Sequence, residues 1–297
     1  MDAGKRKVRR MTTKGKSAEL AQFSSAAIDR LLPILRCPET GERLLKGEGE
    51  FLITKNGGRM WPIIAGRPVF LSDSSKVVVH PETHLSNAIG TDVVGTIEAT
   101  SGFVLQLSAG GTERRFPNVI ECEYAIFRHT DVVGDAHNLP FLDNVFAAVI
   151  SLNAFEHYRE PVQAMSEIGR VLQPAGTLFL HTAFLQPLHE APHHYFNCTK
   201  FGLMQWLRDF DVDRIDVSWN FNPIFALSWL VSELDHGFAA SSPELLERFR
   251  NIRLTDLARF WREPINRAEL LDLFSRLPKP VCEATAGGWE AIAHKRR

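Results

Sequence analysis

The chain has 297 residues, of which 44% are hydrophobic and 23% charged, and its formal net charge is −1. These values are typical of a chain that buries a core, and they exclude whole-chain disorder and a fibrous repeat. A net charge near zero gives no basic field, so a nucleic acid is not expected as a partner. The longest strictly apolar run, residues 145–150, is far shorter than the roughly 20 residues of a membrane helix, so no membrane association is expected.

The N-terminal residues 1–27 are basic and lack periodic apolar side chains, which predicts a disordered tail. No apolar stretch follows them as in a secretory signal. The cysteines are scattered and form no CxxC pair, which favours a reducing compartment. Together these features predict a cytoplasmic protein.

Residues 28–75 are predicted to form a small β-rich unit. A helical turn from Leu31 leads into short apolar runs at 51–54, 60–64 and 68–71, which turn residues separate. A unit of this size holds little core of its own, so we expect it to pack against another part of the chain or a partner.

Residues 85–297 are predicted to form a larger domain with alternating strands and helices. A helix is expected from Pro161, with Met165, Ile168 and Val171 at helical spacing, and Pro174 to Gly176 should end it. This alternation indicates a Rossmann-like α/β fold, a mostly parallel sheet with helices on both faces. The runs expected to be its buried strands are 103–107, 119–120, 132–133, 145–152 and 177–184.

The C-terminal third is expected to be mainly helical. A helix is predicted over 199–208, and residues 220–280 should form a helical insertion over a substrate pocket, broken near Ser241 to Pro243. Two further strands are expected, at 212–219 and 289–294.

Three strand ends carry groups that suit a nucleoside ligand. The turn Ala109-Gly110-Gly111 lets the backbone approach a ligand closely. Glu123 follows the next strand, where a carboxylate can accept both ribose hydroxyls, and Asp135 follows the third, where it can accept from an adenine amino group. Ligands of open parallel sheets bind at the carboxyl ends of the strands. Both acids are expected to be exposed and to add little to stability.

Three consecutive segments then carry a family resemblance: residues 133–143 (VGDAHNLPFLD), 153–157 (NAFEH) and 167–176 (EIGRVLQPAG). Over about 103–184 the chain resembles the class I S-adenosylmethionine-dependent methyltransferases, in their UbiE-like or methyltransferase type 11 branch. The resemblance implies S-adenosyl-L-methionine as cofactor and in-line transfer of its methyl group. The residues implied to bind the cofactor are Ser108, Ala109, Gly110, Gly111, Glu123, Asp135, Ala136, His137 and Asn153.

The glycine-rich turn departs from the family pattern. Gln106, Ser108 and Thr112 stand where the family has an acid and two of its glycines, and residues 112–117 are too few for the usual helix. The main alternative is therefore a catalytically impaired, methyltransferase-like scaffold or regulatory protein. A nicotinamide-dependent dehydrogenase is disfavoured, because its acid follows GxGxxG by about 20 residues, whereas Glu123 follows Gly110 more closely.

Four side chains are predicted to be catalytic: His157, His189, His193 and Tyr195. A neutral imidazole can take the proton of a methyl acceptor. No metal is expected, because Pro192 disfavours a helix that would bring His189 and His193 together. The acceptor is expected to be a sugar or other small molecule.

The N-terminal unit carries a second resemblance, through Leu35 to Gly41 and Met60 to Val69. These segments resemble the small zinc-ribbon-like domain related to activators of tRNA methyltransferases. Only Cys37 could serve as a zinc ligand there, and zinc needs four, so we expect no metal. This unit could contact a protein partner or a second copy of the chain.

Overall fold

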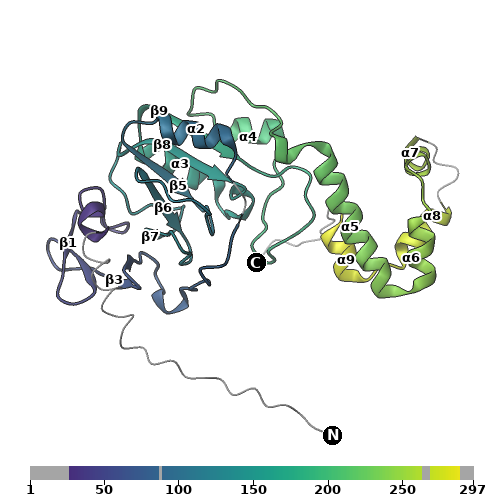
Figure 1. The fold of residues 1–297 in the computed structure, drawn as a ribbon, viewed down its shortest axis with the longest axis horizontal. Coiled ribbons are helices and arrows are strands. Elements are labelled where there is room, and N and C mark those ends of the chain that lie inside the picture. Colours follow the sequence, from purple (N-terminus) through teal and green to yellow (C-terminus); the bar gives the residue numbers. More distant parts are fainter. Residues whose placement is uncertain (1–26, 87–88, 263–267, 288–297) are drawn as a thin grey trace, which may run out of the picture. The chain divides into compact units, whose positions relative to one another are not determined.

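The computed structural model describes residues 27–86, 89–262 and 268–287 (Figure 1). The chain divides into two units, residues 1–181 and residues 182–297. Nearly all of the predicted tail (1–26) and the strand expected at 289–294 lie outside the described residues. The domain boundaries expected near residues 75 and 85 stay predictions.

The N-terminal part of the first unit is an antiparallel sheet in the order β1-β2-β3-β4. Leu52 and Trp61 are buried in it, and the Trp61 Nε1–H donates to the Cys37 Sγ at 3.4 Å. A 3-10 turn, η1 (Ser74–Lys76), follows the sheet. The strands are β1 (Leu44–Lys46), β2 (Phe51–Thr54), β3 (Met60–Ile64) and β4 (Arg67–Pro68).

This small sheet is joined to the central sheet through backbone pairing. Val69 forms a parallel bridge with Val133, and the Phe70 N–H donates to the Val133 carbonyl at 2.8 Å. Val69, Leu71, Ile126 and Val133 form one buried cluster. The N-terminal unit thus covers what would otherwise be an open sheet edge.

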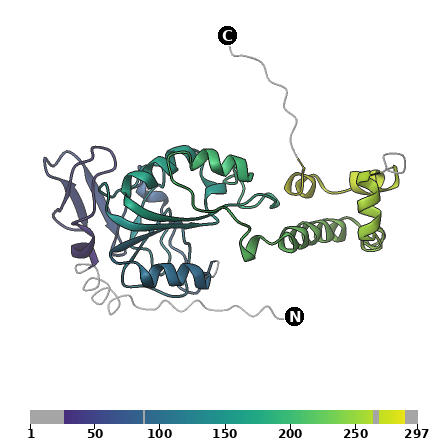
Figure 2. The same cartoon turned by 90° about the horizontal axis from the view of Figure 1, so that it is seen from above.

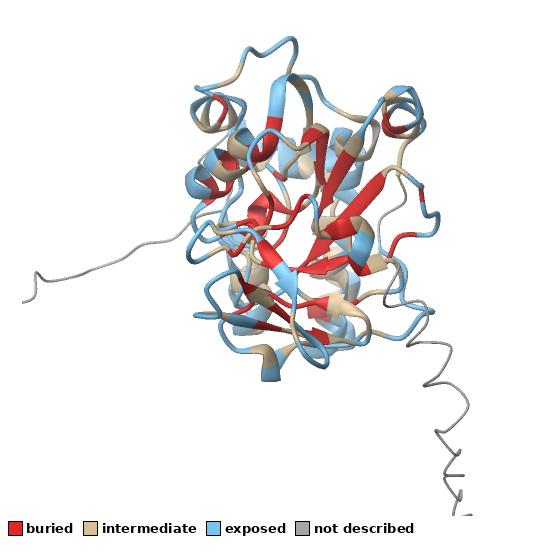
Figure 3. Ribbon diagram, turned by 90° about the vertical axis from the view of Figure 1, so that its left-hand side faces the viewer, coloured by how far each residue is buried: buried red, intermediate tan, exposed pale blue. Residues whose placement is uncertain are grey.

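The central sheet has five parallel strands in the order β7-β6-β5-β8-β9. The chain runs outward from β5 to one side and then crosses to β8, so the strand order reverses at β5. Buried residues concentrate in these strands (Figure 3). This confirms the predicted Rossmann-like α/β class. The strands are β5 (Phe103–Leu107), β6 (Val119–Glu123), β7 (Val132–Val133), β8 (Phe146–Leu152) and β9 (Leu172–His181).

Helices α2 (Thr91–Ala99) and α3 (Pro161–Val171) cover opposite faces of the sheet (Figure 2). Val93 and Ile97 of α2 pack in a buried cluster with Phe116 and with strand residues that include Ala148 and Ile150. Residues 108–118 run from β5 to β6 without a helix, as their number predicts. Helix α2 comes from a stretch in which the sequence gives no strong helical signal.

Helix α3 is confirmed, but it ends before the Pro174–Gly176 segment. Its last residue is Val171, and β9 begins at Leu172. The pairing of β8 with β9 shifts its register between Phe146 and Ala148. The Pro and Gly residues therefore lie in an irregular part of β9 and not at the end of the helix. A 3-10 turn, η2 (Phe155–His157), connects β8 to α3.

The second unit is helical. Phe238 of α5 packs with Leu273 and Leu277 in a buried cluster. The expected strand at 212–219 is wrong: residues 212–218 adopt no regular structure, and Val212 and Val217 are exposed, because no strand within the described ranges pairs with them. None of the described helices is both long and apolar enough to cross a membrane. The elements are α4 (Lys200–Trp206), η3 (Trp219–Phe221), α5 (Pro223–Ser241), α6 (Pro243–Arg250), α7 (Leu254–Arg262), α8 (Ala268–Ser275) and α9 (Lys279–Ala284).

Candidate functional site

Polar residues gather at the carboxyl edge of the central sheet. Ser108, Glu123, Asp135 and Asn153 come at or just after the ends of β5, β6, β7 and β8. The register aligns these ends, since Leu107 pairs with both Cys122 and Ser151, and Glu123 pairs with Val133. The strand order reverses at β5, and this is the place where open α/β sheets bind ligands.

Glu123 is buried at this edge, with 5% of its surface exposed, and the expectation of an exposed carboxylate is wrong for it. Its Oε1 accepts from the Gly110 N–H at 2.8 Å. Burial raises the pKa of Glu123 to about 8, although the N–H groups of Gly110 and Ala109 oppose the shift. Near neutral pH this carboxyl can therefore hold a proton or a negative charge.

A second buried acid, Glu121, stands two residues earlier on the same side of β6. Its Oε1 accepts from the Thr112 hydroxyl at 2.7 Å, while its buried Oε2 has no hydrogen-bond partner within the described ranges. Burial raises the pKa of Glu121 to about 7, and the Thr112 hydroxyl opposes the shift. Two acids with raised pKa values thus lie side by side along β6.

The glycine turn contacts a segment of the chain's own backbone. The Gly111 N–H donates to the Ser86 Oγ at 3.0 Å, and the Ser86 N–H donates back to the Gly111 carbonyl at 2.8 Å. A Cβ on Gly110 would lie 2.2 Å from the Ser86 Oγ, and one on Gly111 would lie 2.1 Å from the His84 carbonyl oxygen. Both glycines therefore permit the close approach of residues 84–86.

Asp135 is held by His137. Its Oδ1 accepts from the His137 backbone N–H at 2.9 Å and from the ring Nδ1 at 2.5 Å. The ring Nε2 accepts from the Glu160 N–H at 3.2 Å, which places the proton of a neutral ring on Nδ1. Burial acts to raise the pKa of Asp135, but the bonds from His137 outweigh it and the pKa is lowered. Ala136, between the two, is buried.

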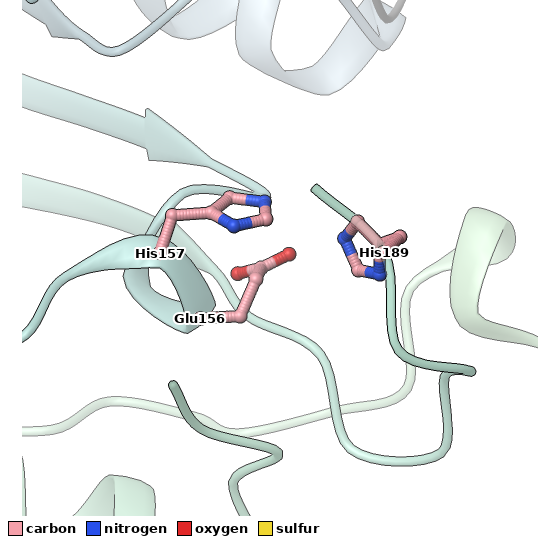
Figure 4. Close-up of side chains that lie close together, drawn as sticks. All are labelled: Glu156, His157 and His189. Atoms are coloured by element: carbon pink, nitrogen blue, oxygen red, sulfur yellow. The ribbon is translucent and has the colours of Figure 1, made fainter. Parts of the chain in front are cut away.

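Asn153 offers an unsatisfied acceptor. It has a left-handed backbone (φ 53°), and its N–H donates to the His181 carbonyl at 3.1 Å. Its buried Oδ1 makes no hydrogen bond within the described residues. Glu156, which is buried, and His157 follow on η2 (Figure 4). Burial lowers the pKa of His181, which keeps that imidazole neutral.

Sequence reasoning missed Tyr158, which is buried beside this edge. Its Oη lies 2.7 Å from the Ser108 Oγ, and its ring packs against those of His137 and Phe155. The residue directly follows the quoted NAFEH segment, but nothing in the sequence indicates a contact fifty residues back along the chain.

Hydrogen bonds join the other two segments that carry the family resemblance, residues 133–143 and 167–176. Glu167 Oε2 accepts from the Leu139 N–H at 2.8 Å, and the Arg170 guanidinium donates to the Leu139 and Phe141 carbonyls and to Asp143. Arg170 also pairs with Glu167 at 2.7 Å. Helix α3 thereby fixes the loop that follows Asp135. Glu167 and Arg170 therefore have a structural role next to the candidate site.

The remaining predicted catalytic residues belong to the second unit. The His189 Nδ1–H donates to the Pro187 carbonyl at 2.9 Å, and the His189 N–H donates to the His194 Nδ1 at 3.2 Å. The His193 Nδ1 and the Tyr195 Oη lie 3.2 Å apart. His189, which Figure 4 also labels, packs against the Trp229 ring. The catalytic roles of these residues stay predictions.

A five-stranded parallel sheet in this order, with helices on both faces and polar groups at its carboxyl edge, defines a Rossmann-like α/β fold. Residues 112–180 match the family model described as a methyltransferase domain. This match supports the expected resemblance to methyltransferases over that region. The zinc-ribbon-like resemblance of the N-terminal unit stays a prediction.

Several solved structures are similar to parts of the chain. A candidate methyltransferase from Bacillus halodurans is 21% identical, with a TM-score of 0.31 over 40% of this chain and 68% of that one. The cyclase SpnF is also 21% identical, with a TM-score of 0.31 over 40% and 55%. Phosphoethanolamine N-methyltransferase 2 from Haemonchus contortus, bound to S-adenosylhomocysteine, is 15% identical, with a TM-score of 0.34 over 61% and 50%. No curated protein matches the sequence.

Proposed function

We propose that the chain is an S-adenosylmethionine-dependent methyltransferase that acts on a small-molecule or sugar acceptor. The observation that carries the proposal is the position of the buried Glu123 carboxyl. It ends β6, beside the turn after β5 and within the region that matches the methyltransferase family. A carboxylate there is placed to accept the two hydroxyls of a ribose.

The residues at the edge fit this cofactor. The Asn153 Oδ1 is a buried acceptor that still lacks a donor, which suits a ligand with a positive charge. Glu123 supplies a negative charge once it is ionised, and Asp135, with its lowered pKa, supplies another. Ser108, Ala109, Gly110 and Gly111 would face the methionine part, and Ala136 and His137 would lie near the adenine.

When bound, S-adenosylmethionine supplies a methyl group made electrophilic by its sulfonium. The chain's task is then to hold an acceptor atom in line with the S–CH₃ bond, and such positioning can lower a barrier by roughly 7 to 11 kcal/mol at its upper end. His157, His189, His193 and Tyr195 are the side chains we propose for binding the acceptor or taking its proton.

A specific observation also favours the second candidate, a catalytically impaired scaffold or regulatory protein. Glu123 and Ser86 take up the Gly110 and Gly111 N–H groups, and Asp135 is held by His137. A protein that uses these groups for its own packing gains rigidity at the edge whether or not a cofactor binds.

Calorimetry of the full chain with S-adenosylmethionine and S-adenosylhomocysteine tests the proposal. Binding of either compound at up to millimolar concentration is expected, and no binding by either one refutes it. Turnover is then measured on a panel of sugars and small metabolites with hydroxyl, amine and carboxylate acceptors. Binding without turnover across the panel would support the scaffold instead.

Several further properties belong to the same proposal. We propose a cytoplasmic protein without a membrane or nucleic-acid partner. Its N-terminal unit would be free of metal, since Cys37 is the only cysteine in residues 28–75, which contain no histidine, and a zinc site needs four ligands. That unit is also the part we propose for contacts with a second copy or a protein partner. Size-exclusion chromatography with light scattering measures the oligomeric state.

A further inference from the structure

The backbone of Ser108 has an unusual conformation for a residue with a side chain. Its φ of 55° lies in the left-handed region, which glycine adopts freely and other residues adopt at a cost of about 1 to 2 kcal/mol. Ser108 is the first residue after β5, so this conformation sets the direction in which the turn 108–111 leaves the sheet. Some interaction has to hold the serine there.

The Tyr158 hydroxyl is the group in position to do so. Its oxygen lies 2.7 Å from the Ser108 Oγ, and the tyrosine is buried. Burial raises the pKa of the phenol well above its ordinary value, so the hydroxyl keeps its proton throughout the neutral range. The phenol is therefore a permanent hydroxyl partner for the serine.

The tyrosine ring is itself fixed by neighbours from two loops. It packs edge-on against the His137 ring at 5.6 Å between centroids, and against the Phe155 ring at 4.8 Å. His137 holds Asp135, and Phe155 belongs to η2. Tyr158 thus connects the turn after β5 with the loops after β7 and β8.

We propose that Tyr158 is a positioning residue. Its hydroxyl bonds Ser108 and thereby holds it in the left-handed conformation, an interaction called the clamp below. The clamp allows a serine to occupy a position at the start of the turn that glycine would adopt without strain. The consequence for cofactor binding rests on the proposed function, because it requires the turn to bind S-adenosylmethionine. The clamp itself does not.

Exchanging residue 108 separates this role from simple packing. Tyr158→Phe keeps the ring and removes the hydroxyl, which should lower the affinity for S-adenosylhomocysteine roughly 2- to 12-fold, the range of one net hydrogen bond. Ser108→Ala should cause a similar loss, because alanine keeps the strain and lacks the bond. Ser108→Gly needs no clamp, so adding Tyr158→Phe to it should change the affinity less than about twofold.

The same variants in urea unfolding, without cofactor, test the clamp alone. Tyr158→Phe should reduce the folding equilibrium constant roughly 2- to 12-fold with serine at position 108 and less than about twofold with glycine there. The matched control is Ser151→Ala, which removes a buried hydroxyl of β8 that makes no hydrogen bond within the described residues. In that background the dependence on residue 108 should persist.

An equal effect of Tyr158→Phe with serine and with glycine at position 108, in both measurements, would overturn the proposal, and so would no effect in either background. If the wild-type chain binds no S-adenosylhomocysteine, the proposed function fails, while the urea measurements still decide whether the clamp exists. A dependence on residue 108 seen in unfolding but absent from the affinity would leave Tyr158 a purely structural residue and would also overturn its positioning role.

Discussion

The Gly110 N–H donates to the Glu123 Oε1 at 2.8 Å, so the acid that ends β6 braces the turn that follows β5. These two features, a carboxylate and a glycine turn, are adjacent parts of one partly buried hydrogen-bonded unit. A ribose at this edge would have to share the Glu123 carboxyl with Gly110. Cofactor affinity and the stability of the turn should therefore depend on the same side chain.

At pH 8.5, where the Glu123 carboxyl is mainly ionised, Glu123→Ala should lower the affinity for S-adenosylhomocysteine roughly ten- to a hundredfold, since a hydrogen bond to a charged group contributes about 1.5 to 3 kcal/mol. Asp135→Ala should weaken binding less, because it removes one amino-group contact. Calorimetry measures both. Glu113→Ala, at an exposed acid in the same part of the chain, is the control and should change nothing. Unchanged affinity in both site variants, with the fold intact, would mean that the cofactor binds elsewhere.

The stability of the cofactor-free protein should fall as the pH rises from about 6.5 to 8.5. Burial raises the pKa of Glu121 to about 7 and of Glu123 to about 8, from an ordinary 4.5, so the folded state binds more protons than the unfolded state in this window. Each group then lowers the free energy of unfolding by at most about 1.4 kcal/mol per pH unit. His129 and His181 do not reverse this pH dependence of the free energy of unfolding. Burial lowers their pKa values, and above pH 6.5 both are mostly neutral in the folded and in the unfolded state.

Urea unfolding at pH 6.5, 7.5 and 8.5 checks this dependence. Glu123→Gln should flatten the curve up to about pH 8 and Glu121→Gln only up to about pH 7, because each acid lowers the free energy of unfolding until the pH passes its pKa in the folded state. Identical slopes in the wild type and both variants would show that neither acid titrates in this range.

Arg170→Ala should destabilise the fold by about 2 to 3 kcal/mol, because it removes charged hydrogen bonds to two carbonyls and two carboxylates and leaves the Glu167 carboxylate without its ion-pair partner. Arg170→Lys should recover little, since an ammonium lacks the guanidinium's planar set of five donors. The comparison is Arg248→Ala, at the more exposed Arg248–Asp272 pair, which should cost less than about 1 kcal/mol. Equal losses from the two alanine variants in urea unfolding would contradict a structural role for the motif.

Gly111→Ala should displace residues 84–86 from the turn, because the new Cβ would lie 2.1 Å from the His84 carbonyl oxygen. Amide hydrogen exchange at Ser86, whose N–H bonds to the Gly111 carbonyl, should then become faster. Gly95→Ala is the matched control. That glycine lies inside α2 with no atom within 4 Å of the added carbon, so the variant should be more stable by roughly 1 kcal/mol. Unchanged exchange at Ser86 in Gly111→Ala would show that the segment does not depend on this contact.

The sequence by itself determined where the buried strands of the central sheet lie along the chain, where helix α3 begins and which strand ends carry polar groups. These features are local: an apolar run of five to seven residues, a proline at a first helical position and an acid after a strand can each be recognised within a short window. Parallel pairing then forces the ends of β5 to β8 onto one edge, so the sequence alone predicts that Glu123 and Asp135 lie at the same edge of the sheet.

Only the tertiary structure decided what those residues contact. The hydrogen bond between Ser86 and Gly111 joins residues 25 apart in the sequence, and the one between Ser108 and Tyr158 joins residues 50 apart. Nothing within a short window of sequence encodes either pair. The burial of Glu123 likewise follows from the segments packed around β6 and not from its neighbours in the chain. Periodicity also misjudged residues 212–218, because an apolar pattern becomes a strand only when another strand pairs with its backbone, and pairing is a property of the assembled fold.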